Sequence, residues 1–289
     1  MLTFTQFLAD LTNPALEFLP RALAAALISA VVCAVVGAHV VLRSLAFIGD
    51  AVAHAVFPGI AIAFVLQGSV LLGGAIAGAA VALIIAVTSQ RRRVKEDTII
   101  GIVFAGAFAL GMVIISRAAG YSASLTSFLF GSLTGVSRLD VITSAVVGAI
   151  VIGAVLLCHR QLVAVALDRE TARAMNLRVL LLDIVLYFAV TAAVVISVRT
   201  VGNILVLALL VTPAASARLL TDRLGVMMWL SAAFGAAGCI LGMYLSWAAN
   251  LPSGATIVLT LTGLFAAAWV LAPKHGLLGR LRRPAAVGA

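Results

Sequence analysis

The sequence has 289 residues, of which 64% are hydrophobic and only 10% are charged, and its mean hydropathy is +1.23. Soluble globular domains contain about 25% charged residues, so this composition excludes an ordinary soluble domain and predicts a membrane protein. The net charge of +9 does not indicate nucleic-acid binding, because the basic residues are spread over several short connectors between apolar runs.

Apolar segments long enough to cross a bilayer recur along almost the whole chain. We predict spans over residues 18–42, 48–66, 69–89, 98–117, 140–158, 180–199, 202–220, 226–248 and 254–272. There are nine spans if each range crosses the membrane, and eight if one is re-entrant or merged with a neighbour. The predicted fold class is therefore all-α, a polytopic transmembrane helical bundle of eight to nine spans.

Basic residues mark the connectors that are expected to face the cytoplasm under the positive-inside rule. These connectors are residues 90–97, 159–179 and 221–225, and the C-terminus lies on the same side. The tail of residues 276–289 is rich in small residues and is expected to be disordered and cytoplasmic.

Two ionisable residues, Asp50 and His54, occur inside the second predicted span, in SLAFIGDAVAHAVFPGIAIAF. A spacing of four places both side chains on one face of a helix. Inserting an aspartate into hydrocarbon costs about 2.5–3.5 kcal/mol, so such residues usually mark an ion or proton path. A carboxylate oxygen and an imidazole nitrogen together suit a divalent transition metal. The structural alternative is a pair that satisfies itself within the bundle.

Pro58 and Gly59 follow this pair directly. Pro58 has no N–H, so the carbonyl of His54 loses its helical partner and the helix is expected to kink there. A backbone carbonyl that lacks a hydrogen-bond partner at membrane depth is tolerated only where it faces protein or a water-lined cavity. We expect Pro58 and Gly59 to provide the kink, and the gating, of a site that opens and closes.

The long cytoplasmic connector contains a second candidate segment. Asp168 suits a helix N-cap, Glu170 falls in the first turn, and Ala172 and Met175 are spaced i, i+3 on one side. Asn176 can adopt the left-handed conformation that ends such a helix. We predict a short cytoplasmic coupling helix that docks a partner; the alternative is a helix lying on lipid headgroups.

Two further expectations concern polar residues and missing motifs. Asp183, near the inner end of its span, is expected to pair with a loop arginine in a structural role. The sequence contains no GxxxxGK[ST] phosphate loop, HExxH or GxSxG motif, so any ATP hydrolysis has to come from a separate chain and no catalysis is expected here.

Five segments in order are similar to the membrane permease subunits of ABC importers for zinc, manganese and iron, over about residues 15–275. They are GAHVVLRSLAFIGDAVAHAVFPGIAIAF at 37–64, EDTIIGIVFAGAFALGMVI at 96–114, SFLFGSLTGVSRLD at 127–140, ALDRETARAMNL at 166–177 and VGNILVLALLVTPAASARLL at 201–220. The most specific part is the core Gly-Asp-Ala-x-x-His-Ala-x-x-Pro-Gly. Asn176 departs from the family, which commonly has Gly there.

This resemblance implies that residues 15–275 form a permease domain in a bacterial cytoplasmic (inner) membrane. Asp50 and His54 would line the path of a manganese, zinc or iron ion, which is cargo, and no cofactor would be permanently bound. The implied partners are a second permease in a homodimer or pair, a cytoplasmic ABC ATPase dimer, an extracytoplasmic metal-binding protein and membrane lipid. Two chains around a two-fold axis would supply four ligands.

Two other function classes stay open on the residues alone. An ion-coupled secondary transporter of divalent metal would show broken helices in both halves of an inverted repeat, whereas only residues 50–59 show a clear break. An intramembrane hydrolase could use Asp50 and His54 as acid–base partners, but it would lack a second catalytic carboxylate or a zinc motif.

Overall fold

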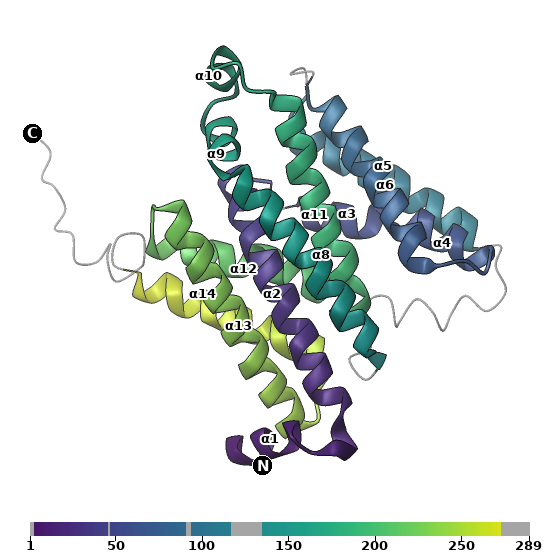
Figure 1. Ribbon diagram of the computed structural model, residues 1–289, viewed down its shortest axis with the longest axis vertical. Helices are drawn as coiled ribbons and strands as arrows, with labels where there is room; N and C mark the ends of the chain where they lie inside the picture. The colour runs from purple at the N-terminus through teal and green to yellow at the C-terminus, as the bar shows by residue number, and fades with distance from the viewer. Residues whose placement is uncertain (1–2, 46, 91–93, 117–134, 273–289) are drawn as a thin grey trace, which may run out of the picture.

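Two apolar helices form the centre of a helical bundle. The computed structural model describes residues 3–45, 47–90, 94–116 and 135–272. The central helices α2 (Phe18–Leu42) and α11 (Val179–Val201) pack against each other (Figure 1). Both are apolar on all sides and mostly buried, as expected of helices surrounded by other helices in a membrane bundle.

The other long helices surround this centre on two sides (Figure 1). One side consists of α3 (Ile48–Ala55), α4 (Phe57–Val65), α5 (Val70–Thr88) and α6 (Glu96–Ile115). The other consists of α12 (Asn203–Leu220), α13 (Leu224–Ala249) and α14 (Ser253–Leu271). Helix α8 (Arg138–Leu157) packs on both α2 and α11.

Short helices lie at the two ends of the bundle. Helices α9 (His159–Leu167) and α10 (Arg169–Ala174) lie at the top of Figure 1, and α1 (Phe4–Leu11) lies at the bottom with the N-terminus. A 3₁₀ turn at Pro14–Leu16 joins α1 to α2. The end that carries α9 and α10 also carries the basic connectors 90–97 and 159–179 (Figure 1), which the sequence analysis expects to face the cytoplasm.

The predicted fold class, an all-α bundle of eight to nine spans, is confirmed. Eight helices in the described part of the chain are long and apolar enough to cross a membrane, and α12 contributes a shorter apolar stretch, Leu205–Leu220. One segment differs from expectation, because residues 159–167 form α9 where only a connector leading to Asp168 was predicted. The predicted tail 276–289 lies outside the described residues.

Helices α4 and α5 approach each other through two glycines, Gly59 and Gly73. A Cβ atom on either residue would lie closer than van der Waals contact to the carbonyl oxygen of the other. Small residues let helix backbones approach closely in lipid, where burial of apolar surface between helices provides little driving force. Gly59 therefore fixes the packing of α4 on α5; its predicted part in gating stays a prediction.

We expect Gly59→Ala to destabilise the protein by about 1–3 kcal/mol, because the added methyl group has to push two backbones apart. The measurement is the midpoint of thermal unfolding of the purified protein in lipid or detergent. The matched control is Gly153→Ala in α8, where a Cβ would meet nothing within 4 Å. Wild-type stability of Gly59→Ala would contradict the packing role, and lost transport at unchanged stability would favour gating.

Candidate functional site

Asp50 and His54 lie one helical turn apart on α3, as the spacing predicts. The Nε2 atom of His54 is 3.4 Å from the Oδ1 atom of Asp50. The Asp50 side chain is 28% exposed and the His54 side chain 20% exposed in the single chain. Both side chains are therefore half-buried at a surface of the protomer, where atoms from outside this chain can reach them.

Two phenylalanines of α6 form the wall behind the His54 ring. The centroid of the His54 ring lies 5.5 Å from that of Phe104 and 5.4 Å from that of Phe108. The His54 and Phe108 rings meet edge to face. This packing restricts the orientation of the imidazole and leaves its polar edge toward Asp50. The sequence analysis did not single out Phe104 and Phe108, although their i, i+4 spacing places them on one face of α6.

The predicted helix interruption after His54 is present and is one residue long. Val56 separates α3 from α4, and Pro58 is the second residue of α4, where a missing N–H is tolerated. Gly111 of α6 packs against this junction, since a Cβ there would lie 3.0 Å from the Pro58 nitrogen. The break is thus held by α6, the same helix that contacts His54.

The described residues of one chain supply too few ligands for a complete metal site. Within the described ranges, no three histidine, cysteine, aspartate or glutamate side chains are grouped closely enough to hold a metal ion. Divalent metals of this type take four to six ligands. Asp50 and His54 can therefore provide only half or less of a coordination sphere.

Helix α10 has the local structure predicted for the coupling segment. Asp168 is its N-cap and accepts hydrogen bonds from the backbone N–H groups of Glu170 and Thr171, at 3.0 and 3.2 Å. Asn176 adopts the left-handed conformation, with a φ of 62°. These two predictions are confirmed.

The predicted apolar edge of α10 is divided between two environments. Ala172 is 1% exposed and packs inside this chain, whereas Met175 is 63% exposed. The expectation that both face a partner is therefore wrong for Ala172, because Ala172 belongs to the buried core that also contains Leu162 and Val165 of α9. Glu170 and Met175 remain on the accessible surface.

Asp183 pairs with arginines, as predicted. Its carboxylate is fully buried and forms ion pairs with Arg43, at 2.7 Å, and with Arg169 of the cytoplasmic connector. An aspartate buried in this way is stabilised only when its charge is paired and hydrogen-bonded.

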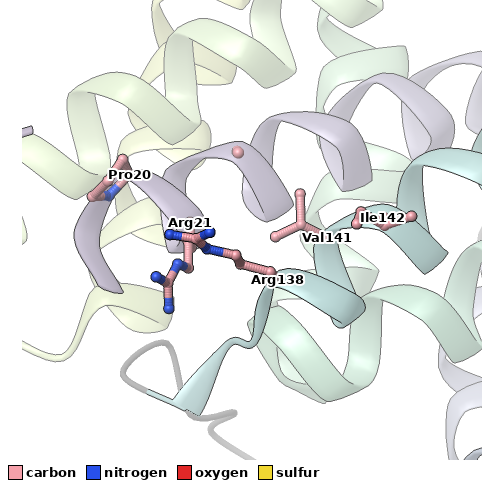
Figure 2. Close-up of a pocket in the computed structure, with 6 residues that line it drawn as sticks. Pro20, Arg21, Arg138, Val141 and Ile142 are labelled. Carbon is pink, nitrogen blue, oxygen red and sulfur yellow. The ribbon is translucent and has the colours of Figure 1, made fainter. Parts of the chain in front are cut away.

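A pocket of about 380 Å³ at the opposite end of the bundle, between the starts of α2 and α8, offers no ligands for a cation (Figure 2). Arg21 and Arg138 lie side by side along it, and both pair with Glu17. Guanidinium groups have no acceptor and repel cations. Asp50 and His54 therefore remain the better candidates for a metal site.

Comparison with known proteins decides the family. A family model described as the ABC 3 transport family matches residues 15–272. The chain belongs to this family. It is 41% identical over 267 residues to the manganese transport system membrane protein MntC of Halalkalibacterium halodurans, covering 92% of this chain and 91% of the relative. It is 35% identical over 264 residues to the chelated iron transport system membrane protein YfeC of Yersinia pestis, covering 91% and 89%.

A solved structure of the same type agrees with the fold. PsaBC from Streptococcus pneumoniae, in complex with Fab, superposes with a TM-score of 0.84 at 32% identity, covering 97% of this chain and all of the compared chain. The predicted resemblance is confirmed, and with it the predicted class, a membrane permease of an ABC transporter. The family match removes the secondary-transporter and hydrolase alternatives.

We expect Asp168→Ala to weaken α10 by about 0.5–2 kcal/mol, because two backbone N–H groups lose their acceptor. The measurement is amide hydrogen exchange at Glu170 and Thr171, which should become faster. Asp168→Asn is the matched control, since asparagine caps helices as well as aspartate does. An equal loss of protection in both variants would assign the effect to the charge of Asp168 rather than to its capping hydrogen bonds.

Proposed function

We propose that residues 15–275 form the permease of an ATP-driven importer that carries manganese(II), with iron(II) as a second cargo, across the bacterial cytoplasmic membrane. The observation that carries the proposal is the Asp50–His54 pair. It is a two-ligand half-site, half-buried, at a surface of the protomer and oriented by aromatic side chains of α6. Such a half-site becomes useful when a second chain completes it.

The exposed face of α6 supports a paired permease. The small residues Gly101, Ala105, Gly106 and Ala109 are exposed along it, and a Cβ on either glycine would meet nothing within 4 Å. Small residues are enriched where transmembrane helices pack closely on one another. A second copy seated on this face would lie next to the wall of the Asp50–His54 pair and would bring its own carboxylate and imidazole to the site.

The two ends of the bundle suit different partners. We assign α9 and α10 to the cytoplasm, where the exposed Glu170 and Met175 are available to a docking ABC ATPase dimer. The opposite end would receive the metal from an extracytoplasmic binding protein. The basic residues near the end of the sequence support a cytoplasmic C-terminus in this proposal.

Ligand chemistry and the relatives' names support manganese over zinc. A carboxylate oxygen suits manganese, an imidazole suits several transition metals, and the pair contains no thiolate, which would favour softer ions. The relatives compared above are named for manganese and for chelated iron transport. The ion is cargo in this proposal, so a site that binds it weakly enough to release it is expected.

We expect Asp50→Asn and His54→Ala to lower manganese uptake by at least about tenfold, since even outer residues of metal sites cost about 10–100-fold in affinity when lost. The measurement is manganese accumulation by cells that depend on this transporter, with iron and zinc measured in parallel. Asp97→Asn is the matched control, because Asp97 is an exposed carboxylate in the first turn of α6. Normal uptake by either site variant would refute the site.

We expect Ala105→Cys to form a disulfide between two copies in the membrane, which requires their Cα atoms to lie within about 7 Å. The experiment is done with Cys158 replaced by serine, since Cys33 and Cys239 are buried. Ile150→Cys, exposed on α8, is the control position. Dimers formed at position 150 and not at 105 would place the paired surface on α8.

A further inference from the structure

Four charged side chains from four different helices meet at the cytoplasmic end of the bundle. Arg169, the first residue of α10, forms ion pairs with both Glu96 and Asp183. Glu96 is the first residue of α6, and Asp183 lies on α11. Arg43, which follows the last residue of α2, pairs with Asp183 through Nη1 at 2.7 Å. We call these four residues the cytoplasmic charge cluster.

The cytoplasmic charge cluster is neutral and largely buried. Asp183 is fully buried and the Arg43 side chain is only 5% exposed. Two neutral groups complete it, since Gln90 donates to Asp183 Oδ2 at 3.0 Å and Tyr187 donates to Glu96 Oε2 at 3.3 Å. Buried ion pairs often add little net stability compared with apolar residues of the same size. A role in holding one arrangement of the helices explains such a cluster better than stability does.

Arg169 is the member that joins the connector to the membrane helices. Helix α10 has only six residues and packs on α9 and α11. The Arg169 side chain reaches beyond these neighbours to the start of α6. A guanidinium can hold two carboxylates at once through its planar set of donors, whereas a lysine ammonium is a point charge on a flexible stem.

Both helices that form the metal half-site begin close to the cytoplasmic charge cluster. Helix α6 starts at Glu96 and carries Phe104 and Phe108, which contact His54. Helix α3, which carries Asp50, follows Arg43 after a short turn in which Ser44 has a φ of 58°. A displacement of Arg169 therefore reaches the half-site by two routes, through Glu96 and through Asp183 and Arg43.

A polar pocket beside the cluster leaves room for a second arrangement. The pocket, about 270 Å³ in volume, is lined by Arg43, Glu96, Arg169 and residues 165–168. The Nε and Nη2 groups of Arg43 are buried and have no hydrogen-bond partner among the described residues. A carboxylate that leaves Arg169 could find donors on Arg43, and such an exchange would give the two discrete arrangements that transmission through a protein requires.

We propose that Arg169 is a positioning residue that transmits the movement of α10 to α6 and to the α2–α3 turn, and so to the Asp50–His54 half-site. This inference rests on the proposed docking of an ATPase at α10. Loss of Arg169 should leave docking intact and separate ATP hydrolysis from metal transport.

The test uses the complete transporter, permease with its ATPase and binding protein, reconstituted in vesicles. The ratio of manganese ions transported to ATP hydrolysed is measured for Arg169→Gln, Arg169→Lys and the double variant Arg169→Gln/Glu96→Gln. The double variant keeps the cluster neutral, so it guards against failure of the single variant to fold. Arg178→Gln is the matched control, because Arg178 is exposed in the same connector and forms no ion pair among the described residues.

We expect all three Arg169 variants to copurify with the ATPase, and Arg169→Gln and the double variant to transport about tenfold less manganese per ATP than Arg178→Gln. Arg169→Lys should lie between them and the wild type. An unchanged ratio would overturn the inference, as would loss of ATPase binding or of membrane insertion in all three variants, which would make Arg169 a structural residue. Failure of the wild-type permease to bind an ATPase would instead overturn the proposed function.

Discussion

Hydrocarbon offers no hydrogen bonds, and this constraint governs where most of the described charged residues of this bundle lie. An unpaired charge in a lipid-buried helix is costly, so the described charged residues either pair inside the bundle or lie near its ends. Asp183 pairs with two arginines, which lets α2, α10 and α11 meet around one buried carboxylate. Asp50 and His54 depart from this pattern, because they form a partly exposed pair in the first and last turns of α3, a short apolar helix that ends just after His54.

Close helix packing complements this electrostatic constraint. Gly59 and Gly73 bring α4 against α5, and Gly111 brings α6 against the junction of α3 and α4. These contacts leave the α3–α4 break little freedom of its own, so movement at the proposed metal half-site would have to involve α5 or α6. These glycines permit backbone contact, and the part of Gly59 in gating stays a prediction.

Under the proposed function, helix α6 would connect three roles that would otherwise be separate. Its first residue belongs to the cytoplasmic charge cluster, its phenylalanines orient His54, and its exposed small residues offer a surface for a second permease. In a paired transporter, one shift of α6 would change the distance between the two half-sites and their shape together. Packed helices switch between discrete positions rather than deforming continuously, so such a shift would expose a bound cation to one side of the membrane and then to the other.

The amino-acid sequence by itself determined the features that depend on neighbouring residues. Hydropathy predicts the lengths of the spans, and the spacing of four places Asp50 and His54 on one face of a helix. Pro58 predicts the helix interruption beside them. Asp168 and Asn176 predict where the connector helix begins and ends. Each of these is governed by interactions within about one helical turn, so local patterns are sufficient to predict them.

Only the tertiary structure decided the contacts between residues far apart in the chain. These contacts depend on which helices become neighbours. They include the aromatic wall of Phe104 and Phe108, the contact between Gly59 and Gly73, and the burial of Ala172. The ion pairs of Glu96 with Arg169 and of Arg43 with Asp183 depend on the same choice of neighbours. The long helices of this bundle are apolar on nearly every side, so their sequences carry almost no amphipathic signal that indicates which face meets which partner. Side-chain packing and charge pairing across the bundle select that arrangement, and they act only once the helices have come together.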